Sequence, residues 1–118
     1  MGHIVQSRDQ VPKLLGASPQ LSPDEAVRYQ RGSPPINGDA DAMTLERASS
    51  VLEKGLAMIT RRLESLSDEQ AARSLDLFGN GKPDSVLGWV FFFYFHDSYH
   101  TGELAVLRQL CGKPVKIV

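Results

Sequence analysis

The sequence has few of the features that mark secreted, membrane-spanning or nucleic-acid-binding proteins. Its single cysteine, Cys111, cannot form a disulfide within the chain, which favours a reducing compartment. Its longest apolar stretch covers ten residues, 86–95, whereas a membrane-spanning helix needs about 20. A net charge of -1 excludes the dense basic surface of a dedicated nucleic-acid binder and gives no electrostatic attraction to an anionic membrane.

The start of the chain also lacks the apolar run of a secretory signal, because charged and polar residues occupy positions 8–10 and 13. Together with the lone cysteine, this predicts a cytoplasmic protein. The 118 residues are 42% hydrophobic and 23% charged, a composition typical of globular proteins. The length predicts one domain over residues 1–118.

Helical periodicity dominates what the sequence does contain. Apolar residues recur every three or four positions, which predicts long helices over 2–15, 45–65 and 85–110. Gly16 and Gly112, with Pro114, are typical of helix ends. Proline disfavours the interior of a helix, so Pro12 predicts a kink or a second short helix near Val11.

Shorter helices are expected in the connections. Ser22 and Pro23 form a typical helix start and predict a short helix over 23–30, and Ser67 predicts a helical turn over 67–70. The segment 86–95 is apolar on all sides, which predicts burial on nearly every side. The expected fold class is therefore all-α, an up-and-down helical bundle.

Two of the three histidines, His96 and His100, are four residues apart in the last predicted helix. This spacing places their Cβ atoms about 5–6 Å apart on one helix face, where two imidazoles can share a metal ion. His3 lies on another predicted helix, and three histidines with a water would form an open catalytic metal site. Two alternatives stay open. His96 and His100 could each have a hydrogen-bond partner of its own, with Asp97 and Tyr99 on an exposed flank of the helix. His3 could be a frayed terminal residue or a remnant of a purification tag.

The residues around the histidines resemble a known family. The segment HDSYHTGEL over 96–104, followed by LRQLCG over 107–112, resembles the last helix of the DinB-like (damage-inducible) family. The opening GHI at 2–4, with LLG at 14–16, resembles the family's second helix, which carries a third histidine ligand. The resemblance extends over essentially the whole chain. It implies a four-helix bundle of which this chain lacks the first helix.

The resemblance also implies a function. It implies a divalent metal, zinc or nickel, held by His3, His96 and His100, and a thiol transferase or hydrolase acting with a low-molecular-weight thiol such as mycothiol or bacillithiol. Glu103 replaces the family's usual glutamine and is expected to act as a catalytic proton acceptor, a closing metal ligand or a solvated, salt-bridged residue. A bundle without one helix exposes an apolar stripe, which predicts a homodimer. The competing hypothesis is a non-catalytic, dimerising stress-response bundle whose metal is structural.

The remaining candidates for chemistry are weaker. The segment GNGK at 79–82 lacks the spacing of a phosphate-binding loop and is interpreted as a turn. Cys111 lies in the last turn of a helix, where the helix dipole disfavours a thiolate, so we expect it to fill a small space in the core. The aromatic residues at 89–95 are expected in the core, and Gly102 is expected to allow close approach of another helix.

Overall fold

The structure is a computed structural model that describes residues 1–38 and 42–113. Helix predominates, in agreement with the predicted all-α class. The helices are α1 (Gly2–Arg8), α2 (Gln10–Leu14), α3 (Pro23–Tyr29), α4 (Leu45–Glu64), α5 (Asp68–Ala72) and α6 (Val86–Leu110).

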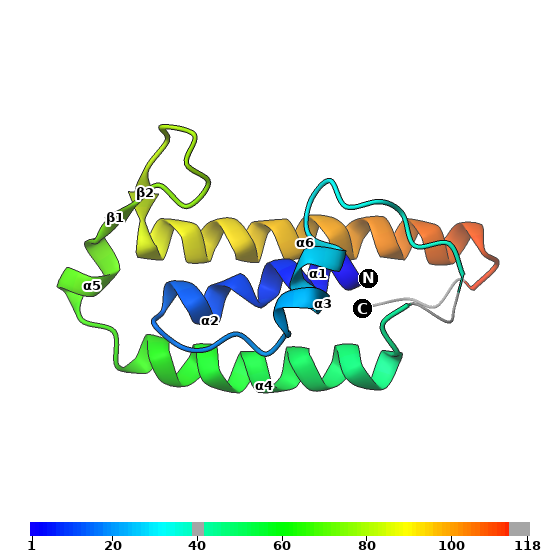
Figure 1. Ribbon diagram of the computed structural model, residues 1–118, viewed down its shortest axis with the longest axis horizontal. Helices are drawn as coiled ribbons and strands as arrows, with labels where there is room; N and C mark the ends of the chain where they lie inside the picture. Colours follow the sequence, from blue (N-terminus) through cyan, green and yellow to red (C-terminus); the bar gives the residue numbers. More distant parts are fainter. Residues whose placement is uncertain (39–41, 114–118) are drawn as a thin grey trace.

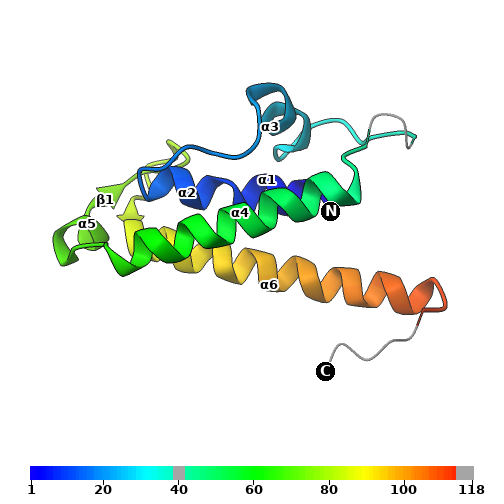
Figure 2. The same ribbon diagram turned by 90° about the horizontal axis from the view of Figure 1, so that it is seen from below.

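The two long helices, α4 and α6, pack against the two short N-terminal helices, α1 and α2. In Figure 1, α1 and α2 lie end to end between α4 and α6, and they contact both long helices. Figure 2 shows the same arrangement from below, with α3 on the far side of α1 from α6. The long helices begin and end close to the predicted positions, whereas Pro114, expected beyond the last helix, lies outside the described residues.

The first predicted helix is divided at Asp9, slightly earlier than expected. Asp9 ends α1 and begins α2. Pro12 has no N–H to donate to the carbonyl of Arg8 one turn earlier, which explains why the break precedes the proline. The buried Asp9 carboxylate accepts hydrogen bonds from the backbone N–H groups of Gln20 at 2.7 Å and Leu21 at 2.9 Å. This carboxylate therefore fixes the connection that follows α2.

The core has two parts, and the two short N-terminal helices each contribute to one of them. One part joins α2 to the start of α6 and the end of α4, and consists of Val11, Leu14, Leu15, Ile59, Val86, Trp89 and Phe93. The other joins α1 to the start of α4 and consists of Val5, Leu21, Ala48 and Val51. Burial of each large apolar side chain contributes about 1.5–3 kcal/mol, so the short helices are held mainly by packing.

The short helix α3 covers the start of α1. Ser22 accepts a hydrogen bond from the Glu25 N–H, and Glu25 in turn accepts one from the Ser22 N–H, a capping box that fixes the beginning of α3. Tyr29, at its end, is buried, and its ring lies so close to Gly2 that a Cβ atom there would overlap the ring. The glycine thus permits the contact between α1 and α3.

Two short strands precede α6 and were not predicted. Strands β1 (Ser74–Leu75) and β2 (Asp84–Ser85) pair in antiparallel fashion, and the indole N–H of Trp89 donates to the Leu75 carbonyl at 2.7 Å. Between them, 79–82 belongs to an irregular connection held by Asp76, whose carboxylate accepts from the N–H groups of Asn80 and Gly81. The interpretation of this segment as a turn rather than a phosphate-binding loop agrees with this geometry.

The expectation that 86–95 is buried on nearly every side is wrong. Phe91, Tyr94 and Phe95 are 65%, 69% and 66% exposed, because the described residues cover α6 on one side only. Its buried residues, Val86, Trp89, Phe93 and Asp97, all lie on the inner side. From residue 86 to 102 the only Asp, Glu, Lys or Arg is Asp97, so the outer face of α6 over this length is uncharged.

Two smaller expectations at the end of α6 are also wrong. Cys111 is exposed and does not fill a space in the core, because the last turns of α6 extend beyond the helices that cover its first half. A side chain at Gly102 would meet open space, so no other helix of the described chain approaches it closely. Within the described residues, no helix has the length and apolar character needed to cross a membrane.

Candidate metal centre

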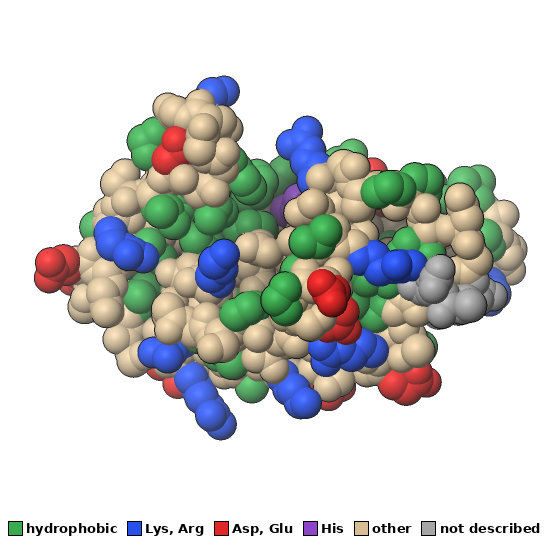
Figure 3. Space-filling model, in the orientation of Figure 1, with side chains coloured by type: hydrophobic (Ala, Val, Ile, Leu, Met, Phe, Trp, Pro, Cys, Tyr) green, Lys and Arg blue, Asp and Glu red, His purple; other side chains and the backbone are tan. Residues whose placement is uncertain are grey.

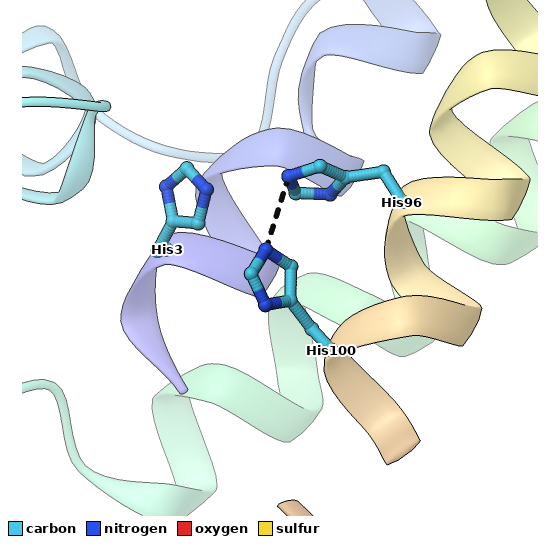
Figure 4. A group of neighbouring side chains, drawn as sticks. All are labelled: His3, His96 and His100. Carbon is cyan, nitrogen blue, oxygen red and sulfur yellow. Dashed lines mark hydrogen bonds between the residues drawn. The ribbon is translucent and has the colours of Figure 1, made fainter. Parts of the chain in front are cut away.

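Three histidines from two helices converge on one point. His3 lies in the first turn of α1, and His96 and His100 lie on successive turns of α6 (Figure 4). One ring nitrogen of each histidine lies within 4.8 Å of the corresponding nitrogens of the other two. The centroid of the His3 ring is 5.2 Å from that of His96 and 5.3 Å from that of His100. This cluster could hold a metal ion.

Hydrogen bonds at Nδ1 orient two of the three rings. The Nδ1 of His100 lies 2.7 Å from Oε2 of Glu103, and the Nδ1 of His3 lies 3.2 Å from the carbonyl oxygen of Tyr29. A carboxylate and a carbonyl can only accept, so each Nδ1 carries the proton and donates it. The lone pair of a neutral imidazole is then on Nε2, the nitrogen that remains for a metal.

The third ring, His96, provides a test of whether the site fits a metal. Its Nε2 lies 3.2 Å from Nε2 of His100, so without an ion the His96 Nε2 must carry the proton between them. The buried Nδ1 of His96 would then be an acceptor, and it has no hydrogen-bond partner among the described residues. With a metal on Nε2, Nδ1 carries the proton instead and faces Oδ1 of Asp97 at 3.8 Å, an atom that also lacks a partner. The donor set therefore fits a metal.

Electrostatics favour the neutral form of His96, which is the form that binds metals. Burial lowers the pKa of His96, and the neighbouring His100 and His3 lower it further, while Asp97 acts in the opposite direction. On the other side of the cluster, the hydrogen bond from His100 lowers the pKa of the Glu103 carboxyl. The same carboxylate raises the pKa of the Tyr99 hydroxyl.

An ion pair joins the two helices that carry the histidines. Arg8, at the end of α1, donates from Nε to Oδ2 of Asp97 on α6. The suggestion that Asp97 lies on an exposed flank is wrong, because its side chain is buried on the inner face of α6. Helical spacing alone places it there, four residues after the buried Phe93. Tyr99, by contrast, is 58% exposed, which agrees with the suggestion that it lies on an exposed flank of the helix.

Glu103 contacts the side of the His100 ring that faces away from the other two histidines. Its carboxylate contacts Nδ1 of His100, whereas the nitrogen that faces His96 is Nε2. Half of the Glu103 side chain is exposed. Glu103 can therefore orient the His100 ring. Its bound carboxylate oxygen lies at Nδ1, on the opposite edge of the ring from the Nε2 atom that would bind the metal.

Sequence reasoning missed two other contributors to the site, Tyr29 and Arg8. Tyr29 acts through its backbone carbonyl, which no residue type encodes, and Arg8 is one of many basic residues in the chain.

Comparisons of this chain with protein-family models, with curated proteins and with solved structures found no match.

Proposed function

We propose that the protein is a metal-dependent enzyme of the DinB-like type, a thiol transferase or hydrolase. One divalent ion, zinc or nickel, would be held by His3, His96 and His100. The observation that carries the proposal is the convergence of three imidazoles with two Nδ1 atoms already engaged as donors. Such a metal lowers the pKa of a bound water or thiol and polarises a carbonyl group.

The number of protein ligands supports a catalytic site over a structural one. In the described part of the chain, no fourth His, Cys, Asp or Glu joins the three histidines. Structural zinc sites have four protein ligands, whereas catalytic sites keep a position for water or substrate. Glu103 is the closing ligand that the sequence suggested, but its carboxylate oxygen is bonded to Nδ1 of His100.

The residues around the ligands would prepare the site for chemistry. The Tyr29 carbonyl and the Glu103 carboxylate hold the His3 and His100 rings with Nε2 directed inward. Partners of this kind typically account for 10–100-fold of metal affinity or activity. Phe92 and Phe93 lie beside His96 and give one wall an apolar character that strengthens electrostatic interactions.

A second candidate is a non-catalytic dimerising bundle with a structural metal, and one observation supports its dimerisation. The outer face of α6 is uncharged over residues 86–102, and its first half is largely apolar and includes the exposed Phe91, Tyr94 and Phe95. Such a face is unusual on a monomer, and two-fold symmetry allows one face to cover its own copy. A homodimer is therefore part of the proposal and is compatible with either function.

Cobalt substitution combined with a thiol assay separates the two functions. Protein purified without an affinity tag is loaded with Co²⁺, and its visible spectrum is recorded with and without a small thiol. A spectral change on thiol addition, together with conjugation of the thiol to a fluorogenic electrophile, supports the enzyme. A cobalt spectrum that no thiol changes supports the structural metal, and protein that binds no cobalt refutes both.

A further inference from the structure

A pocket lies beside the proposed metal centre and shares one of its ligands. It has a volume of about 420 Å³ and is lined by Gly2, His3 and the segment 28–36. Small-molecule sites commonly have volumes of about 300–1,000 Å³. Figure 3 shows that this face of the molecule is hollowed and that a histidine side chain lies recessed in it.

The charge of this pocket has one sign. Among the described residues that line it, the only charged ones are Arg28 and Arg31, and none is acidic. Arg28 has other interactions within the chain, whereas Arg31 lies in the exposed turn that follows α3. A guanidinium presents paired N–H donors in a plane that matches a carboxylate, so the lining favours an anion.

The wall that carries Arg31 is held in shape by local structure. Ser33 donates from its backbone N–H at 3.1 Å and from its hydroxyl at 2.8 Å to the carbonyl oxygen of Gln30. Gly32 has a φ of 83°, a conformation that other residues rarely adopt, and Pro34 and Pro35 restrict the chain that follows. A preorganised wall reduces the entropy lost when a ligand binds.

His3 connects the pocket to the metal centre. Its Nδ1 faces the carbonyl oxygen of Tyr29, which belongs to the pocket lining, and the opposite nitrogen, Nε2, is the one available to the metal shared with α6. A molecule bound at the metal therefore lies on the other side of the same imidazole from the pocket. The pocket and the metal position lie on opposite sides of the His3 ring, so a substrate that occupies both would have to extend around this ring.

We propose that the substrate of the metal site is a small anion, and that its carboxylate binds in this pocket with Arg31 as the principal contact. The inference rests on the proposed function, since it concerns the substrate of the same metal. It adds to that function a charge requirement that metal chemistry alone does not impose.

The test uses the cobalt-loaded protein and two series of simple thiols. One series comprises mercaptocarboxylates of increasing chain length, and the other the neutral mercaptoalcohols of the same lengths. The affinity of each thiol is measured from the cobalt spectrum, and the ratio between matched pairs reports the charge preference. A second measurement, the amide NMR shifts of residues 28–36 during titration with succinate, detects anion binding without a thiol.

We expect a roughly 3- to 10-fold preference for the carboxylate at the chain length that reaches Arg31, because the arginine is exposed and its attraction is partly screened. Arg31→Gln should reduce the preference to about one, and Arg31→Lys should retain part of it. Arg73→Gln, which removes an exposed arginine at the α5 end of the molecule, is the matched control and should retain the full preference.

Equal affinities within every matched pair, with no shift at residues 28–36 on addition of succinate, would overturn the inference while leaving the metal site intact. A preference that survives Arg31→Gln would overturn the role of Arg31. Failure of the wild type to bind cobalt refutes the proposed function, and the inference fails with it. A normal cobalt spectrum with succinate-induced shifts but no thiol binding supports the anion pocket and counts against thiol chemistry.

Discussion

Arg8 and Asp97 form an ion pair that links the end of α1 to the middle of α6, within the stretch of α6 that carries His96 and His100. Asp97 is 6% exposed, and its second carboxylate oxygen, Oδ1, has no hydrogen-bond partner among the described residues. The pair holds α1, with His3 in its first turn, against α6. The relative position of the three histidines therefore depends on a contact that involves none of them.

Replacing Arg8 with Met tests this link. The substitution leaves a buried carboxylate without its cation, and we expect it to lower the free energy of unfolding by about 2–3 kcal/mol in chemical denaturation. The double variant Arg8→Met, Asp97→Asn removes the uncompensated charge and should recover part of the loss. Equal stability of Arg8→Met and the wild type would contradict a structural role for the pair.

Elemental analysis of histidine variants tests the metal assignment. The wild type should contain about one divalent ion per chain, and either His96→Ala or His100→Ala should lose it, because a chelate on one helix face needs both arms. His3→Ala should weaken binding as well, and Tyr94→Phe, a change at an exposed tyrosine of the same helix, serves as the control. Full metal content in the His96→Ala, His100→Ala double variant would disprove the site.

Substitutions of Glu103 distinguish its three expected roles. A glutamine retains an oxygen that can accept from Nδ1 of His100, so Glu103→Gln should keep metal affinity within a few-fold of the wild type. Glu103→Ala removes the partner and should weaken metal affinity by about tenfold or more, measured by competition with a chelator. Slower turnover of Glu103→Gln at full metal content would identify a proton acceptor, and loss of metal from Glu103→Gln would identify a closing ligand.

The pair formed by Glu25 and Arg47 predicts how stability depends on pH. The hydrogen bond from Arg47, at 2.7 Å, is the main cause that lowers the pKa of Glu25 from 4.5 to about 2. A lowered folded-state pKa contributes stability that is complete above pH 4.5 and is lost as the pH falls from about 4.5 towards 2. Because both side chains are about one-third exposed, solvent screening limits the contribution to about 1 kcal/mol.

Glu25→Gln is the variant that measures this effect. Thermal melts between pH 2 and pH 7 should show lower stability than the wild type at neutral pH and convergence of the two proteins near pH 2. Equal stability of the two proteins across this range would show that Glu25 stabilises the fold through its capping box, which a glutamine also forms, and not through its charge.

The outer face of α6 predicts a homodimer. Light scattering at micromolar concentration should give twice the chain mass of 13.0 kDa. The double variant Phe91→Asp, Phe95→Asp places charges on the proposed interface and should give a monomer. Val27→Asp, at an exposed apolar position of α3, is the matched control and should leave the dimer intact. A monodisperse wild-type monomer would contradict the prediction.

Local sequence signals were sufficient for most of the helices. Ser22, Thr44 and Ser85 each accept a hydrogen bond from the first turn of the helix they precede, and residue type alone is enough to recognise such caps. The spacing of His96 and His100 also predicted their shared face directly. These features depend on residues within about one helical turn of each other.

The features that sequence reasoning missed depend on which side of a helix is covered. An apolar stretch such as 86–95 is compatible with burial on every side, and only the packing of α1 and α2 leaves Phe91 and Phe95 exposed. The ion pair of Asp97 likewise depends on packing, because the helical spacing that places Asp97 on the inner face does not identify Arg8 as its partner. His3 was included from its place on another predicted helix and from the family resemblance, because nothing near it in the sequence indicates contact with α6.

The division at Asp9 has a consequence for how the metal centre assembles. With seven residues, α1 is too short to be stable as an isolated helix in water, so the place of His3 is set by Val5 in the core and by the ion pair of Arg8. A metal that binds all three histidines would bind only the docked form of α1. Ion binding and local folding are then thermodynamically linked, and metal should slow hydrogen exchange of the α1 amides and raise the melting temperature in proportion to the logarithm of its concentration.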